Sequence, residues 1–288
     1  MLVNLKEILE IAEKNHCAIG MFNATGLDSV QAIIKAAEEL HQPVILAHAE
    51  VHNVYNDISL VAPVMLAVAK NASVPVCVHL DHGTSMEMIK RALDLGFTSI
   101  MVDASALPFE ENVKMTKQVV EMAHAQNVSV EAELGRLVTS EAGSSSEISH
   151  QNPRDFYTNP EEAKRFVEQT QVDALAIAFG TSHGFYHAEP VLDFQVIEKV
   201  RNVVSVPLVM HGGSGVSQKD YVHAIESGIR KINYYSYMSK AGYEAAKKVM
   251  EENQTKYLHD VEFAAMKAMK EDVKKAMKVF SMVDVKHD

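Results

Sequence analysis

Eight short apolar runs, separated by stretches of helical periodicity, constrain the fold of this 288-residue chain more than any other feature. Most of the runs are apolar at nearly every position, which is typical of parallel strands buried on both faces. Eight strand–helix units predict an α/β protein with a closed (β/α)8 TIM barrel, which needs about 250 residues, rather than an open sheet. The expected strands are Cys17–Phe22, Pro43–Ala47, Pro75–Leu80, Ser99–Val102, Val128–Ala132, Ala174–Phe179, Pro207–Met210 and Gly228–Ile232.

Helical segments are expected both between the strands and outside the repeat. An N-terminal helix, Leu5–Lys14, is expected to close the barrel floor, and two extra helices, Tyr243–Asn253 and Glu262–Phe280, follow the last strand. The apolar face of the second is expected to pack on the barrel or on a partner subunit. Because no low-complexity linker interrupts the chain, residues 1–288 are expected to form a single domain, with a C-terminal helical extension from about residue 238. The other expected helices are Ser29–Glu39, Ser85–Asp94, Glu111–Ala125, Pro160–Gln169, Asp193–Val200 and Gln218–Ser227.

The acidic composition narrows the possible partners. Lys plus Arg number 27 and Asp plus Glu number 38, which gives a net charge of −11. A chain this acidic is a poor match for nucleic acid or an anionic membrane surface. Cys17 and Cys77 lie in apolar stretches and indicate free thiols of a reducing compartment. With no visible signal peptide, and a longest apolar run of only Val61–Ala69, the sequence predicts a cytoplasmic protein with no membrane or nucleic-acid partner.

Histidines stand at the ends of three expected strands, where barrel active sites lie. Three imidazoles with one open position form a known catalytic zinc arrangement, and His82, His183 and His211 fit it. His48, after the second strand, is interpreted as a pocket group or as support for a metal ligand. The other histidines noted have no such context and are expected to be solvated; they are His41, His52, His124, His150, His187, His223, His259 and His287.

Carboxylates accompany these histidines. Asp81 adjoins His82, whereas Glu131 and Glu133 are two residues apart and so share one face of their strand. A pair of buried acids rarely stabilises a fold. We therefore expect that these acids take part in acid–base chemistry, bind a metal ion, or form a hydrogen bond to a residue that binds the metal. Asp103 could orient a metal-bound histidine through its second ring nitrogen.

A glycine cluster follows the seventh strand. The run His211-Gly212-Gly213-Ser214-Gly215 offers closely spaced backbone N–H groups. With Asn233, Tyr234, Tyr235 and Ser236 after the eighth strand, it occupies the place where barrels bind phosphate. Gly184 would let the backbone approach the same ligand, and Asn23 adds a polar end to the first strand.

Five motifs in order resemble those of class II, metal-dependent fructose-bisphosphate and tagatose-bisphosphate aldolases, from about Leu2 to Val279. They are Val78–Gly83, Val130–Gly135, Tyr157–Ala163, Ala178–Gly184 and Leu208–Gly215. The resemblance implies zinc on His82, His183 and His211, with Glu133 as an alternate metal ligand and Asp103 as support or a further alternate. It implies that Asp81 handles the aldehyde oxygen and that Glu141, on the long loop from Arg136 to Asn159, abstracts the proton.

The resemblance also implies the donor substrate. Gly184, Gly212–Ser214 and Asn233–Ser236 match positions that hold dihydroxyacetone phosphate, with a monovalent cation, Na⁺ or K⁺, near the phosphate. The predicted function is a zinc-dependent aldolase that reversibly cleaves a phosphorylated ketose to dihydroxyacetone phosphate and an aldehyde. A homodimer or homotetramer is expected.

This chain departs from the family pattern on the acceptor side. Tyr235 replaces a small or acidic group, and Ala49 lacks the family's serine hydroxyl. Lys270, a weak candidate for the second phosphate, stands where many members have Arg, and Val138-Thr139 replaces Gly-Gly in the loop. We therefore expect that fructose 1,6-bisphosphate is not the best substrate.

Three alternatives compete with this prediction. A metal-dependent hydrolase would use the histidines to activate water, but would give the glycine cluster no role. A Schiff-base aldolase would use Lys231, which shares a strand face with Asn233, and would leave the histidines idle. A non-catalytic binding protein is not favoured, because every metal and acid–base position is filled.

Overall fold

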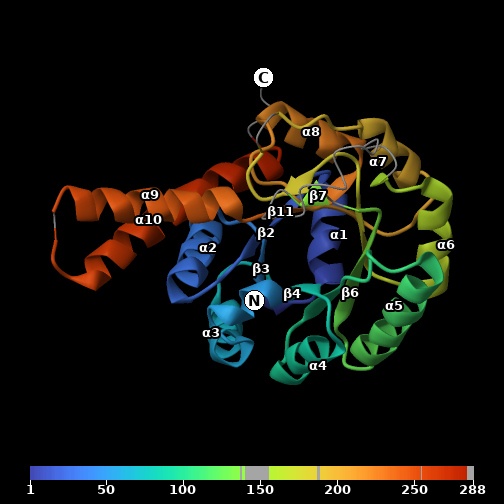
Figure 1. Ribbon diagram of the computed structural model, residues 1–288, viewed down its shortest axis with the longest axis horizontal. Helices are drawn as coiled ribbons and strands as arrows, with labels where there is room; N and C mark the ends of the chain where they lie inside the picture. Colours follow the sequence, from blue (N-terminus) through green and yellow to red (C-terminus); the bar gives the residue numbers. More distant parts are fainter. Residues whose placement is uncertain (137, 140–155, 187–188, 254, 284–288) are drawn as a thin grey trace.

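A closed barrel of eight parallel strands forms the centre of the computed structural model, which describes residues 1–136, 138–139, 156–186, 189–253 and 255–283 (Figure 1). Pairing of β4 with β5 closes the ring, so the expected (β/α)8 fold is confirmed, and each of the eight expected runs contributes one strand. The barrel strands are β2 (Ile19–Asn23), β3 (Val44–Ala49), β4 (Val76–Gly83), β5 (Ser99–Val102), β6 (Ser129–Leu134), β8 (Ala174–Ile177), β10 (Leu208–Met210) and β11 (Ile229–Tyr234).

Among the described residues, one further short strand joins the barrel sheet, and two others form a separate small sheet. The strand β1 (Leu2–Val3) pairs with β4, and β7 (Val138–Thr139) pairs in parallel with β9 (Ser182–His183). The second pair ties the start of the loop after β6 to the backbone of His183.

Helices surround the barrel, and local sequence signals fix several of their ends. Ser85 caps α4 by accepting a hydrogen bond from the Met88 amide, and Gly96 ends that helix in the left-handed region. At the barrel floor, α1 buries four apolar residues, as expected. The helices are α1 (Leu5–Asn15), α2 (Leu27–Leu40), the 3₁₀ helix η1 (Glu50–Val54), α3 (Ile58–Asn71), α4 (Met86–Leu95), α5 (Phe109–His124), α6 (Pro160–Thr170), α7 (Phe194–Arg201), α8 (Gln218–Ser227), α9 (Ser236–Glu251) and α10 (Leu258–Phe280).

The two C-terminal helices form an arm that extends away from the barrel (Figure 1). The helix α9 begins at Ser236, seven residues before the expected start, and only Met238 and Gly242 are buried along it. The C-terminal half of α10 packs on the barrel with Val273, Met277 and Phe280, whereas the outer part of the arm exposes apolar side chains.

Cys17 and Cys77 are buried free thiols, at 7% and 0% exposure. In the described part of the chain, no helix combines the length with the apolar character that crossing a membrane requires.

Candidate functional site

The carboxyl ends of the barrel strands surround a cavity of about 480 Å³. Many of the residues that the sequence singled out at a strand end contribute to its wall, but His48, Glu131, His211 and Gly215 do not. The lining residues are Asn23, Ala49, Val51, His52, Asp81, His82, Asp103, Ser105, Ala106, Glu133, Arg136, His183, Gly184, Gly212, Gly213, Ser214, Asn233, Tyr234, Tyr235 and Ser236.

Three imidazoles converge at one side of this cavity: His82 and His183 line its wall, whereas His211 is fully buried and is not a lining residue. His82 ends β4, His183 lies in β9 and His211 follows β10, so each arrives from a different part of the barrel rim. One ring nitrogen of each lies within 4.8 Å of the others, and His211 Nδ1 is 3.0 Å from His82 Nε2. Neutral imidazole nitrogens at this spacing are the donor set that zinc accepts. The three residues therefore fit a metal ion.

A second group, His82, Asp103 and Glu133, could also hold a metal ion. The Glu133 side chain is buried, and its Oε2 has no hydrogen-bond partner among the described residues. Burial, together with the negative charge of Asp103, raises the pKa of Glu133 to about 8. A buried carboxylate oxygen without a donor suits an alternate metal ligand.

Charge neighbours set the protonation of the imidazoles. Burial alone would lower the pKa of His82, but the adjacent Asp81 and the hydrogen bond to Asp103 outweigh it and raise that pKa to about 10. Burial lowers the pKa of His183 to about 3, and that of His211 also falls. His82 Nδ1 lies 2.7 Å from Asp103 Oδ2, which orients the ring so that Nε2 faces the other imidazoles.

Asp81 is held by two amides. Its Oδ2 accepts a hydrogen bond from Asn23 Nδ2 at 2.9 Å, and its Oδ1 accepts one from Asn233 Nδ2 at 3.2 Å. Although burial opposes ionisation, the neighbouring His82 and other cationic groups lower the pKa of this carboxyl. Asp81 is therefore an ionised carboxylate on the cavity wall.

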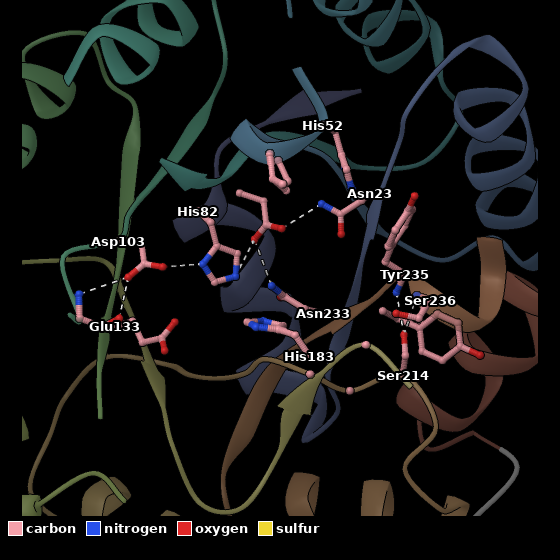
Figure 2. A pocket seen from close by; sticks show the side chains of 18 of the residues that line it. Asn23, His52, His82, Asp103, Glu133, His183, Ser214, Asn233, Tyr235 and Ser236 are labelled. Atoms are coloured by element: carbon pink, nitrogen blue, oxygen red, sulfur yellow. Dashed lines mark hydrogen bonds and ion pairs between the residues drawn. The ribbon is translucent and has the colours of Figure 1, made fainter. Parts of the chain in front are cut away.

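The glycine cluster and the N-terminus of α9 form a cradle opposite the carboxylates. Ser214 Oγ accepts hydrogen bonds from the amides of Tyr235, at 2.8 Å, and Ser236, at 3.0 Å, and Figure 2 shows these three side by side. A Cβ on Gly212, whose φ is +62°, would meet the Ser182 carbonyl at 2.3 Å. Backbone amides at a helix N-terminus bind anions, and glycine residues beside them leave room for the anion to approach.

Aromatic and apolar groups form the wall beyond Asp81. His52, on η1, is 9% exposed, and its ring centroid lies 4.7 Å from that of Tyr235. The prediction that His52 is solvated is therefore wrong, because η1 folds over the cavity. His48 is fully buried, with Nδ1 3.4 Å from the Ala24 carbonyl oxygen, and it is not among the described lining residues.

Two lysines that the sequence analysis considered, Lys270 and Lys231, are not among the residues that line the cavity. Lys270, on α10, pairs with Glu39, on α2, at an N–O distance of 2.5 Å and is absent from the described lining. Glu141 lies outside the described residues. The buried Lys231 ammonium pairs with Glu131 at 2.9 Å, which leaves no accessible amine for a Schiff base.

The site therefore defines an α/β-barrel enzyme of a particular class. Its histidine cluster can hold a metal ion, and an ionised acid and an anion cradle line the adjoining cavity. The family model for class-II fructose-bisphosphate aldolase matches residues 3–284. A fructose-bisphosphate aldolase from Staphylococcus aureus (strain Mu50) is 40% identical over 287 residues, covering 97% of each chain.

The protein YdjI from Escherichia coli (strain K12) is 39% identical over 280 residues, covering 97% of this chain and 98% of that protein. The crystal structure of this YdjI aldolase superposes with a TM-score of 0.85 at 38% identity, covering 97% of each chain. The chain belongs to the class II fructose-bisphosphate aldolase family. It is an aldolase, a carbon–carbon lyase whose family implies a phosphorylated sugar substrate and a metal ion.

Proposed function

We propose that the protein is a zinc-dependent aldolase that reversibly cleaves a ketose 1-phosphate to dihydroxyacetone phosphate and an aldehyde. One observation carries the proposal: a cluster of three converging imidazoles, two of which line the cavity, lies beside an anion cradle in the same cavity. A metal-dependent hydrolase would need no cradle beside its metal, and the family membership favours the aldolase.

His82, His183 and His211 would hold the zinc ion, with Glu133 as the alternate ligand and Asp103 orienting His82. The bound ion would supply Lewis-acid stabilisation of negative charge on the donor oxygens. In the cleavage direction, Asp81 would take the proton of the acceptor-side hydroxyl, because its carboxylate is ionised and faces the cavity. Glu141 would move the proton at the donor carbon, a role implied by the family resemblance.

The donor phosphate would lie in the cradle. Gly184, Gly212, Gly213, Ser214 and Ser236 line this end, and Asn23, Asn233, Tyr234 and Tyr235 complete the surrounding wall. A monovalent cation, Na⁺ or K⁺, would bind near the phosphate. Its positive charge would favour binding of the anionic donor to a chain whose net charge is −11.

The acceptor half supports a monophosphate substrate. Ala49 offers no hydroxyl, and the Tyr235 ring packs against His52 and so reduces the space on this side of the cavity. Lys270 is paired with Glu39. Losing one charge-assisted contact to a second phosphate costs about 1.5–3 kcal/mol, or about 10- to 100-fold in affinity. The aldehyde released is therefore expected to carry no phosphate.

A retro-aldol assay tests both parts, with release of dihydroxyacetone phosphate as the signal. Chelation should abolish cleavage of fructose 1-phosphate, and zinc should restore it. His211→Ala should lose activity, whereas His223→Ala, on the outer helix α8, should keep it. Full activity of metal-free protein, with borohydride trapping on Lys231, would refute the metal assignment.

Substrate preference is tested by kcat/KM for fructose 1-phosphate, fructose 1,6-bisphosphate and tagatose 1,6-bisphosphate. The monophosphate should match or exceed the bisphosphates, and Lys270→Ala should leave all three values unchanged. A bisphosphate value far above the monophosphate's, falling steeply in Lys270→Ala, would show a working second phosphate site.

The protein is also proposed to be a cytoplasmic homodimer or homotetramer. The α9–α10 arm exposes Tyr243, Met250, Tyr257, Leu258 and Phe263 at 54–71%. Such apolar area on a projecting arm favours contact with a second copy. Light scattering should give a dimer or tetramer mass, and Tyr257→Glu with Leu258→Glu should reduce it; a wild-type monomer would contradict the proposal.

A further inference from the structure

A lysine ammonium lies fully buried beneath the cavity, and the proposed mechanism gives it no task. Lys231, on β11, is 0% exposed. Its Nζ contacts Glu131 Oε2 at 2.9 Å and Oε1 at 3.1 Å, and it donates to Asn233 Oδ1 at 2.7 Å. Burying a charged ammonium costs desolvation free energy unless partners compensate it. The role of Lys231 is therefore inferred from the two side chains that it contacts.

The first partner connects Lys231 to the imidazole cluster. Glu131 Oε1 lies 2.9 Å from His211 Nε2. A carboxylate only accepts hydrogen bonds, so His211 carries its hydrogen on Nε2 and directs the Nδ1 lone pair toward His82 Nε2, 3.0 Å away.

The second partner connects Lys231 to Asp81. An ammonium only donates, so Asn233 must turn Oδ1 toward Lys231, which leaves Nδ2 to donate to Asp81 Oδ1 at 3.2 Å. A flipped amide would set its NH₂ against the ammonium and its oxygen against the carboxylate. Two repulsions would replace two hydrogen bonds.

We propose that Lys231 is a positioning residue that fixes the hydrogen-bond direction of both halves of the site, His211 through Glu131 and Asp81 through Asn233. This inference rests on the proposed function, because it assigns His211 to metal binding and Asp81 to the aldehyde side. It replaces the Schiff-base role considered for this lysine with a structural link between the two halves.

Lys231→Met tests both links with separate readouts. Zinc affinity of the metal-free protein, measured by competition with a chromogenic chelator, should fall about tenfold, in the range seen when support of a metal ligand is removed. With zinc saturating, cleavage should fall at least tenfold more than proton exchange into dihydroxyacetone phosphate. Exchange needs no aldehyde and therefore does not depend on Asp81.

Arg230→Met is the matched control. Arg230 is a neighbouring buried cation, 6% exposed, on the same strand, but it pairs with Glu13 on α1 at 2.9 Å, away from the cavity. This variant should keep wild-type zinc affinity and a wild-type ratio of cleavage to exchange. If Arg230→Met shows the same losses, or if Lys231→Met shows neither, the positioning role is refuted.

A double variant keeps the test decisive if Lys231→Met fails to fold. In Lys231→Met with Glu131→Gln, position 131 no longer carries a buried carboxylate that has lost its cation. The Gln amide oxygen can still accept a hydrogen bond from His211. Zinc affinity should return to within about threefold of wild type, whereas the ratio of cleavage to exchange should stay low, because nothing orients Asn233. A wild-type ratio would overturn the proposal. Failure of the aldolase assignment itself would appear as absent exchange in the wild type, and the zinc measurement would still judge the His211 link.

Discussion

Removing the Asp103 carboxylate is expected to weaken metal binding without unfolding the barrel. Asp103 Oδ2 holds His82 Nδ1 at 2.7 Å, and both side chains are about one-fifth exposed, at 19% and 20%. Loss of such a partner typically costs 10- to 100-fold in metal affinity, or about 1.4–2.7 kcal/mol. Asp103→Ala should therefore raise the zinc Kd by that factor, and Asp103→Asn, which keeps an acceptor but loses the charge, should raise it less.

Chelator competition measures the Kd, and a thermal melt of metal-free protein reports folding separately. Ser105→Ala is the matched control, because Ser105 Oγ donates to the other oxygen, Asp103 Oδ1, at 2.7 Å and leaves the His82 bond in place. It should change the Kd less than about threefold, since it removes only a neutral donor. Equal Kd values for Asp103→Ala and wild type, or equal losses in Asp103→Ala and Ser105→Ala, would refute the reasoning.

Three further expectations concern the cradle, the acid and the arm. Gly213→Ala would place a Cβ 2.6 Å from the Asn233 carbonyl oxygen, so it should raise KM for the phosphorylated donor severalfold in steady-state kinetics. Asp81→Ala should abolish cleavage but spare proton exchange into dihydroxyacetone phosphate, measured by isotope incorporation; loss of exchange alone would contradict its role. Hydrogen bonding to Lys270 lowers the pKa of Glu39 from 4.5 to about 2, so its stabilisation is complete above pH 4.5 and lost as pH falls toward 2. Because this carboxylate is 43% exposed, Glu39→Gln should cost at most about 1 kcal/mol of unfolding free energy at pH 7 and nothing near pH 2 in urea melts.

The barrel strands could be predicted because burial on both faces leaves a nearly continuous apolar run. The helix α3 is not among the predicted helices. Its run Val61–Ala69 is apolar at every position, so the sequence shows no alternation of apolar and polar faces with a helical period. The start of α9 at Ser236 was also missed, since only Met238 and Gly242 are buried along that helix and an unburied helix needs no apolar stripe.

The site residues divide along similar lines. His82, His183 and His211 could be predicted because strand ends of a parallel barrel converge whatever the loops do. His52 could not, because its burial depends on how η1 folds over the cavity. Nor could the sequence place Lys270 beside Glu39, since α10 and α2 are separated by over 200 residues and meet only in the fold.

The three imidazoles also set a condition on biosynthesis. They lie at positions 82, 183 and 211, and the barrel closes only when β11, ending at Tyr234, pairs with β2 near the beginning of the chain. A nascent chain shorter than 211 residues holds at most two of these histidines. A metal ion held by all three histidines would therefore bind only in roughly the last quarter of translation, after the seventh barrel strand, β10, has been synthesised.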